Sequence, residues 1–147
     1  MRFLPILLLS AACAQTTPAP EEAPTPVQPN NATYGTDANL APSAPDAIWR
    51  YADHPRGFAE LRLPAGEGPF PLAVIYHGGC WKTGIASQAY MAPLATRWQS
   101  LGIATLNVDY REVGDGGGWP GSFTDWAASA KLVDEVAARY PIDRDAV

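Results

Sequence analysis

The amino-acid sequence predicts an α/β fold, in which a mostly parallel sheet is covered by helices on both faces and carries an antiparallel hairpin at one edge. Residues 72–76 are continuously apolar, as in strands that are covered on both sides. Residues 103–109 form a second predicted buried strand, and a helical segment separates the two. A right-handed crossover would make these strands parallel neighbours, with residues 72–76 central in the sheet.

Two shorter strands are predicted ahead of the central one, at residues 48–51 and 58–64. The second alternates apolar and polar side chains, which is typical of a half-exposed edge strand. Residues 53–57 read Asp-His-Pro-Arg-Gly, a turn composition, so we expect the two strands to pair as a hairpin and His54 to lie at the surface.

The sequence predicts two helices. The first begins after Ser87 as its cap and ends before Gly102, with apolar positions at helical spacing at Tyr90, Leu94, Ala95, Trp98 and Leu101. The second follows a glycine-rich loop, opens on a capping box of Ser122 and Asp125, and ends at Pro141. Its predicted core face consists of Phe123, Trp126, Ala127, Ala130, Val133, Ala137 and Tyr140.

The first 45 residues do not belong to this fold. Residues 1–14 have one basic residue, an apolar run and small residues, which is typical of an export signal that is too short to span a bilayer. Cleavage after Ala14 would release the protein, whereas cleavage before Cys13 would make a lipoprotein, and both remain open. Residues 15–45 are rich in Pro, Ala and Thr, so we expect a disordered linker to a domain at residues 46–147.

Composition narrows the function further. The net charge is -5 and no cluster of Lys and Arg occurs, so a nucleic-acid surface is not expected. Once Cys13 is cleaved off or lipidated, only Cys80 remains, which leaves no intrachain disulfide. We predict an exported protein of the periplasm or cell envelope, with a membrane tether if Cys13 carries lipid.

The most informative motif is the His77-Gly78-Gly79 turn that follows the central strand directly. A carbonyl under nucleophilic attack develops negative charge on its oxygen, and the amides of a glycine turn can stabilise that charge without a side chain in the way. Gly78 and Gly79 are therefore predicted to form an oxyanion hole.

The nucleophile that such a loop would serve is absent from this sequence. None of the six serines lies in a Gly-x-Ser-x-Gly pattern, and residues 143–147 have the character of a helix exit followed by the start of another strand. The nucleophile elbow normally follows that strand. We therefore expect the chain to be the amino-terminal half of an enzyme, truncated before its nucleophile elbow.

Three motifs in the right order resemble the α/β-hydrolase superfamily, closest to its esterase/lipase branch of feruloyl-esterase-like and kynurenine-formamidase-like enzymes. They are the His-Gly-Gly-Cys-Trp turn at residues 77–81, the strand end Asn-Val-Asp-Tyr-Arg at 107–111, and Gly-Gly-Trp-Pro-Gly at 117–121 before a helix with Asp125. The resemblance covers residues 46–147. It implies an α/β-hydrolase fold and a hydrolase of small-molecule esters or related amides that needs no cofactor or metal.

The resemblance also implies roles for individual residues. Gly78 and Gly79 would be the oxyanion-hole positions, and His77 would orient their loop rather than act as the base. Trp81 supports the loop or lines the acyl pocket, and Trp119 is a candidate pocket residue. Either Asp109 or Arg111 would form a buried structural pair. The Ser-Asp/Glu-His triad would lie beyond Val147, so the chain alone is expected to be inactive.

Two other interpretations remain open. Residues 116–121 formally match the Gly-x-Gly-x-x-Gly fingerprint of dinucleotide-binding proteins, although Pro120 removes an amide where phosphates would bind. A non-catalytic relative could also keep the fold for binding or scaffolding. The residue at the centre of the missing elbow would discriminate, since a serine there supports the enzyme.

Overall fold

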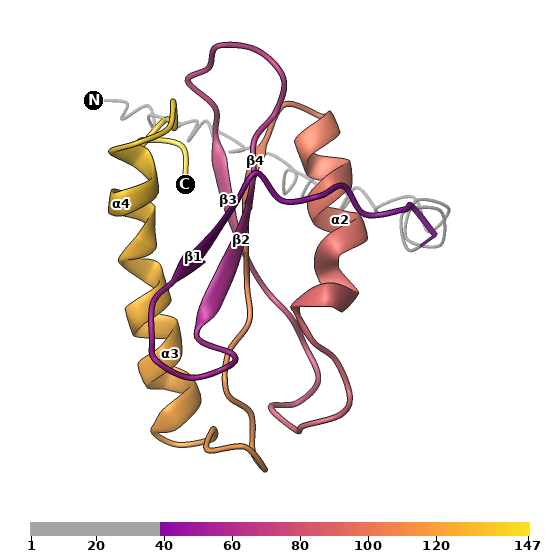
Figure 1. The fold of residues 1–147 in the computed structure, drawn as a ribbon, viewed down its shortest axis with the longest axis vertical. Helices are drawn as coiled ribbons and strands as arrows, with labels where there is room; N and C mark the ends of the chain where they lie inside the picture. The colour runs from indigo at the N-terminus through magenta and orange to yellow at the C-terminus, as the bar shows by residue number, and fades with distance from the viewer. Residues whose placement is uncertain (1–38) are drawn as a thin grey trace, which may run out of the picture.

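The computed structural model describes residues 39–147, so the predicted export signal, Cys13 and most of the linker lie outside the described residues. A four-stranded sheet is covered by one helix on one face and by two successive helices on the other (Figure 1). The elements follow in the order β1 (Ala47–Arg50), β2 (Phe58–Arg62), β3 (Leu72–Tyr76), α2 (Gln88–Ser100), β4 (Ala104–Val108), α3 (Gly121–Ala130) and α4 (Leu132–Ala137). The predicted α/β class, with helices on both faces, is confirmed.

The sheet is mixed and has the strand order β1-β2-β4-β3. β1 and β2 form the predicted antiparallel hairpin, and β3 and β4 form the predicted parallel pair on either side of α2. One placement was wrong, because β2 is an inner strand with β1 on one side of it and β4 on the other. β3 is the last of these four strands.

The segment after α4 lies along the free side of β3. Ile142 makes a parallel bridge with Phe70, the amide of Asp143 donates to the carbonyl of Phe70 at 2.8 Å, and the amide of Leu72 donates to Ala146 at 2.9 Å. These contacts agree with the prediction that a further strand begins near Asp143.

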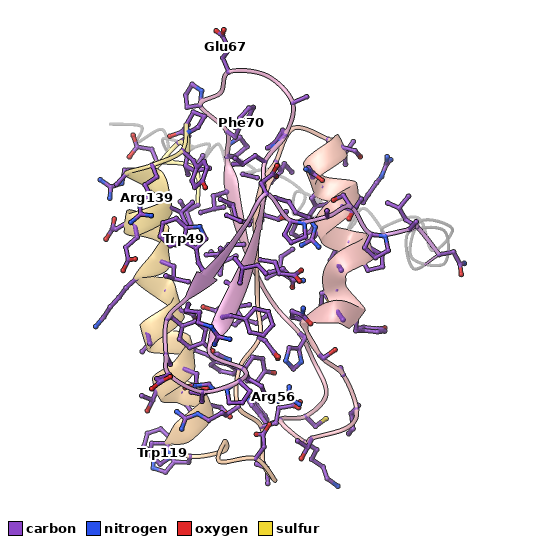
Figure 2. The ribbon with its side chains drawn as sticks, in the orientation of Figure 1. Trp49, Arg56, Glu67, Phe70, Trp119 and Arg139 are labelled. Carbon is purple, nitrogen blue, oxygen red and sulfur yellow. The ribbon has the colours of Figure 1, made fainter. Side chains whose placement is uncertain are left out.

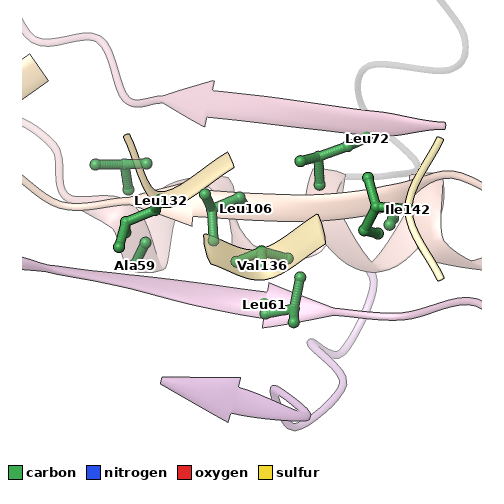
Figure 3. Packing of buried hydrophobic residues seen from close by; sticks show 9 residues of the cluster. Ala59, Leu61, Leu72, Leu106, Leu132, Val136 and Ile142 are labelled. Carbon is green, nitrogen blue, oxygen red and sulfur yellow. The ribbon is translucent and has the colours of Figure 1, made fainter. Parts of the chain in front are cut away.

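The apolar core lies between the sheet and α4. Alternate residues of β2 and β4, including Leu61 and Leu106, point to this side and meet Leu132 and Val136 of α4 (Figure 3). All four side chains are at most 2% exposed. Burial of large aliphatic side chains contributes roughly 1.5–3 kcal/mol each, so this cluster supplies much of the stability of the domain.

The predicted second helix is interrupted at Lys131 and ends at Ala137, earlier than Pro141. Its buried side is also rotated from the predicted one, because it consists of Ser122, Asp125, Ser129, Leu132 and Val136. The apolar pattern misled the prediction because polar side chains occupy the buried positions of α3. The capping box was likewise wrong, since Ser122 and Asp125 lie inside α3 and bond to the loop before it.

Helix α2 begins after Ser87 as predicted, but the Ser87 side chain makes no capping hydrogen bond. Tyr90 and Leu101 were expected to pack on the sheet, yet they are 61% and 59% exposed. Ala95 is buried as predicted, while Leu94 and Trp98 are half-buried. Ala92 is buried beside Ala95, and Nδ2 of the Asn107 side chain donates to the carbonyl of Gln88 at 2.8 Å.

Loops gather at both ends of the sheet. At one end lies the turn with Glu67 and Phe70, and at the other lie the β1–β2 turn with Arg56 and the loop with Trp119 (Figure 2). The carboxyl ends of the parallel strands β3 and β4 face this second end, which is where α/β proteins place their sites. Within residues 39–147, none of the helices is long and apolar enough to cross a membrane.

Candidate functional site

The His-Gly-Gly turn begins immediately after β3, and within residues 39–147 the amides of Gly78 and Gly79 have no hydrogen-bond partner. Gly79 has φ +116°, a left-handed conformation that disfavours any side chain. A Cβ atom added to Gly78 would meet nothing within 4 Å, so space is open beside its amide. Two adjacent, unpartnered amides in an open turn form a site that can receive an anion or a polarised carbonyl oxygen.

The loop is anchored to the segment after β4 by main-chain bonds. The amide of Val113 donates to the carbonyl of Trp81 at 2.6 Å, and Thr83 donates to the carbonyl of Val113 through both its amide and its hydroxyl. Cys80 and Trp81 both have positive φ, 52° and 57°, which costs energy in residues with side chains. The anchoring bonds hold the turn in this unusual conformation.

His77 lies beneath the turn, with its side chain fully buried. Its Nδ1 donates to the carbonyl of Gly78 at 2.9 Å, and its Nε2 lies 3.2 Å from Oδ1 of Asp109. Both partners are acceptors, so the imidazolium form satisfies both contacts. Burial lowers the pKa of His77, but the hydrogen bonds to Asp109 and Gly78 and the nearby carboxylates outweigh it and raise the pKa above its usual value.

Asp109 connects the turn to the rest of the site. Its Oδ1 also accepts from Nη1 of Arg56 at 3.1 Å and from the amide of Tyr110 at 3.0 Å. The Tyr110 hydroxyl donates to the carbonyl of His77 at 2.7 Å, and its ring stacks on the His77 ring with centroids 4.3 Å apart. The expected buried pair thus forms at Asp109, with Arg56 and His77 as its partners.

Arg56 reaches from the β1–β2 turn into a group of three carboxylates. Besides Asp109, its Nε lies 2.5 Å from Asp115 and its Nη2 lies 3.2 Å from Oε2 of Glu112. The Glu112 contact is an ion pair without hydrogen-bond geometry, and the Glu112 side chain is fully buried. A guanidinium at the centre of these carboxylates compensates their charge.

A second ion pair fixes the start of α3. Asp125, with 2% of its side chain exposed, accepts from the amide of Arg111 at 2.9 Å and from its guanidinium at 2.6 Å. Burial raises the pKa of Asp125, but the hydrogen bonds from Arg111 and the charges of His54 and Arg111 lower it below the usual value. His54, predicted to lie at the surface, has a side chain that is 18% exposed, and its Nε2 lies 3.3 Å from Oδ1 of Asp125.

Aromatic side chains form a cluster beside the turn. Trp81 stacks with Phe123 at 6.4 Å and lies 6.0 Å from Trp126, while Trp119 meets Phe123 edge to face at 5.2 Å. Trp119 is 83% exposed and Trp81 is 44% exposed. The structure therefore brings the two candidate pocket residues into one cluster, bridged by Phe123, next to the proposed oxyanion loop.

The glycine-rich loop is tied to the protein by its own amides. Gly117 donates to the carbonyl of Glu112 at 2.9 Å, and Gly118 donates to Oγ of Ser122 at 2.9 Å.

Within residues 39–147, no group of three or more His, Cys, Asp or Glu side chains is placed to hold a metal ion. No serine hydroxyl in this part of the chain is hydrogen-bonded to a histidine. Cys80 is a free, exposed cysteine.

Sequence reasoning missed Arg56, Glu112 and the hydroxyl of Tyr110. Arg56 lies in a turn and meets Asp109 only through the tertiary fold, at a separation of 53 residues. The available signal was the density of charge in residues 109–115, which a buried loop cannot hold without a cation.

The fold and the arrangement of these loops define an α/β-hydrolase-related domain. The chain belongs to the BD-FAE family, whose model matches residues 60–147. This membership confirms the resemblance to the α/β-hydrolase superfamily that the motifs indicated.

Several solved structures share this fold. A bacterial heroin esterase matches with a TM-score of 0.56 and 23% identity over 76% of this chain and 38% of its own. A truncated form of a carbohydrate esterase from gut microbiota has a TM-score of 0.52 and 23% identity over 71% of this chain and 38% of its own. A bifunctional GH43-CE protein from Bacteroides eggerthii has a TM-score of 0.55 and 23% identity, over 69% of this chain and 15% of its own.

The chain thus spans well under half the length of these proteins. A comparison with curated proteins found no match.

Proposed function

We propose that the full-length protein is a serine-type carboxylic ester hydrolase, and that this chain supplies its oxyanion hole through the amides of Gly78 and Gly79. The observation that carries the proposal is the pair of amides at the carboxyl end of β3 that have no hydrogen-bond partner within residues 39–147. Membership of the BD-FAE family and a fold shared with two proteins named esterases support an ester-hydrolysing role.

In the proposed mechanism, a serine outside residues 1–147 attacks the carbonyl carbon of a small-molecule ester. The carbonyl oxygen becomes an oxyanion and accepts hydrogen bonds from Gly78 and Gly79, the alcohol leaves, and water then releases the acyl group. A histidine beyond Val147 takes the proton of the serine and gives it to the leaving alcohol, and an acid beyond Val147 orients that histidine. His77 is unsuited to that task because Gly78 and Asp109 engage both of its ring nitrogens.

His77 contributes electrostatically. Its raised pKa favours the imidazolium form, and Nδ1 of this ring lies 2.9 Å from the carbonyl of Gly78 within the turn. In a water-excluded site, a fixed charge of this kind stabilises the transition state more strongly than it would in water.

The proposal is tested by Gly79→Pro in the natural full-length protein, with an aryl acetate as substrate. Proline cannot adopt φ +116°, so the turn must rearrange and its amides turn away. Loss of one oxyanion donor lowers kcat by about a hundredfold or more, and KM should change little.

Gly66→Pro is the matched control. Gly66 has nearly the same φ, +115°, but lies beside Glu67 at the opposite end of the sheet (Figure 2). The Gly66→Pro variant should be less stable than the wild-type protein but should show no specific loss of kcat. Equal turnover in the two variants, corrected for the folded fraction, would contradict the oxyanion assignment. If the wild-type protein hydrolyses no ester and its elbow carries glycine or alanine in place of serine, the protein is a binding relative.

We also propose that the protein is exported through residues 1–14 and, where Cys13 is lipidated, tethered to a membrane of the cell envelope by the linker. Labelling cells with radioactive palmitate tests this, because a lipidated Cys13 would carry label and fractionate with membranes. A Cys13→Ala variant should lose both properties. Wild-type protein that is unlabelled and soluble in the periplasm would favour cleavage after Ala14.

A further inference from the structure

The peptide group between His77 and Gly78 is held by a tyrosine. Its carbonyl accepts the 2.7 Å hydrogen bond from the Tyr110 hydroxyl. Because a peptide group is planar and trans, its carbonyl and its N–H point in opposite directions, so fixing one fixes the other. The Tyr110 hydroxyl holds the carbonyl on the inner side of the loop, and the Gly78 N–H consequently points away from it.

We infer that Tyr110 is the positioning residue of the Gly78 amide, one of the two donors of the oxyanion hole. The inference rests on the proposed function and adds a residue to it. Tyr110 is 2% exposed and touches the carbonyl of His77 rather than the amide itself, so it acts on substrate only through the peptide plane.

Tyr110 is itself held in place on three sides. Its amide donates to Asp109, its ring stacks on His77 at an interplanar angle of 13°, and the edge of Trp126 approaches at 5.4 Å and 77°. Burial, followed by the negative charges of Glu112 and Asp109, raises the pKa of Tyr110, so the hydroxyl keeps its proton and remains a donor.

A second side chain positions the neighbouring peptide in the same way. Nδ1 of His77 donates to the carbonyl of Gly78, and this carbonyl shares a peptide plane with the Gly79 amide. One amide is thus oriented by Tyr110 and the other by His77, and Asp109 contacts both residues, through the His77 ring and the backbone amide of Tyr110. A Gly-Gly turn without these contacts would rotate easily, and donors that must reorganise during the reaction stabilise an oxyanion less.

The test is Tyr110→Phe in the natural full-length protein, with Tyr76→Phe as the matched control. Tyr76 is half-buried and loses one hydrogen bond, its 2.9 Å contact with the hydroxyl of Ser129, which is not part of the turn. Both variants keep their aromatic rings, and melting temperatures report any difference in folding.

For Tyr110→Phe we expect kcat on an aryl acetate to fall by about tenfold to a hundredfold while KM stays within about twofold, because the lost interaction acts in the transition state. Affinity for an aryl boronic acid, which mimics the tetrahedral oxyanion, should fall in parallel. Tyr76→Phe should leave both values near wild type. Equal effects in the two variants, or a rise in KM with unchanged kcat, would refute the positioning role.

A crystal structure of each variant tests the inference without relying on activity. In Tyr110→Phe the peptide between His77 and Gly78 should be rotated or present in two orientations, and in Tyr76→Phe it should be unchanged. An unchanged peptide plane in Tyr110→Phe overturns the inference even if the enzyme is active. If the wild-type protein hydrolyses no ester, the proposed function is wrong. A rotated peptide in Tyr110→Phe would in that case still support the positioning role of Tyr110.

Discussion

Helices α3 and α4 follow each other on the same face of the sheet, yet they bury opposite kinds of side chain (Figure 1). The buried positions of α3 are Ser122, Asp125 and Ser129, whereas those of α4 are Leu132 and Val136. Ser122 and Asp125 of α3 bond to the loop before the helix, while Leu132 and Val136 of α4 close the apolar core. The buried side of α3 thus holds the loop of the candidate site in place, and the buried side of α4 stabilises the domain.

Asp125→Ala in α3 should cause the largest loss of stability. Removing the carboxylate leaves Arg111 and the buried amide behind it without their partner, so the free energy of unfolding should fall by roughly 3–5 kcal/mol. Urea unfolding of the natural full-length protein, followed by circular dichroism, measures it. Asp134→Ala on α4 is the control, because that carboxylate is 81% exposed in its pair with Arg144 and should matter little.

A comparable loss of stability should follow from Leu132→Ala, but with a different consequence for activity. Truncating this core side chain should cost roughly 2–5 kcal/mol, and the same change at the exposed Leu101 should cost much less. Ester hydrolysis per folded molecule should remain near wild type. A specific loss of kcat in Leu132→Ala would break the proposed division between α3 and α4.

Ser122→Ala should have a smaller effect on stability. The Ser122 hydroxyl donates to the carbonyl of Arg111 at 2.6 Å and accepts from Gly118 at 2.9 Å, and both groups would lose a partner. We expect a cost of about 1–3 kcal/mol and increased protease cleavage within residues 112–121. The control is Ser100→Ala, whose hydroxyl bonds only to its own exposed helix end. Equal cleavage in both variants would argue against Ser122 as the anchor of the loop.

The smallest expected effect is a difference between α3 and α4 in how the cost of a substitution depends on pH. The pKa of Asp125 is lower in the folded protein than its ordinary value of 3.8, so its contribution is present above that pH and lost as pH falls through the folded value. The cost of Asp125→Ala should therefore shrink in acid, while that of Leu132→Ala should not change. Unfolding midpoints measured at neutral pH and below pH 3.8 test this difference. A constant cost for Asp125→Ala would remove the charge-based explanation.

The sequence predicted the strands of this fold well because their apolar patterns are local. The continuous run at residues 72–76 and the crossover to residues 104–108 needed no knowledge of tertiary contacts. The buried side of α3 could not be predicted in this way. Asp125 and Ser122 are buried because each has a polar partner there. Asp125 pairs with the guanidinium of Arg111, and Ser122 donates to the carbonyl of Arg111. Both contacts depend on the conformation of the loop between β4 and α3.

The candidate site followed the same rule. The glycine turn could be predicted, since His77, Gly78 and Gly79 are consecutive and lie at the end of a predicted strand. The residues that support the turn could not be predicted. Tyr110 contacts His77 across 33 residues, and Arg56 contacts Asp109 across 53. Side chains that position a loop through main-chain atoms leave no residue pattern in one sequence.

The aromatic cluster beside the turn also makes the site visible to spectroscopy. Three of the five tryptophans of the chain, Trp81, Trp119 and Trp126, belong to this cluster or border it through Phe123. Indole emission shifts to shorter wavelength when the ring leaves water, and Trp119 is the most exposed of the large apolar side chains. A ligand that settles against the oxyanion loop should therefore change the intrinsic fluorescence, which offers a binding assay that requires neither a chromogenic substrate nor turnover.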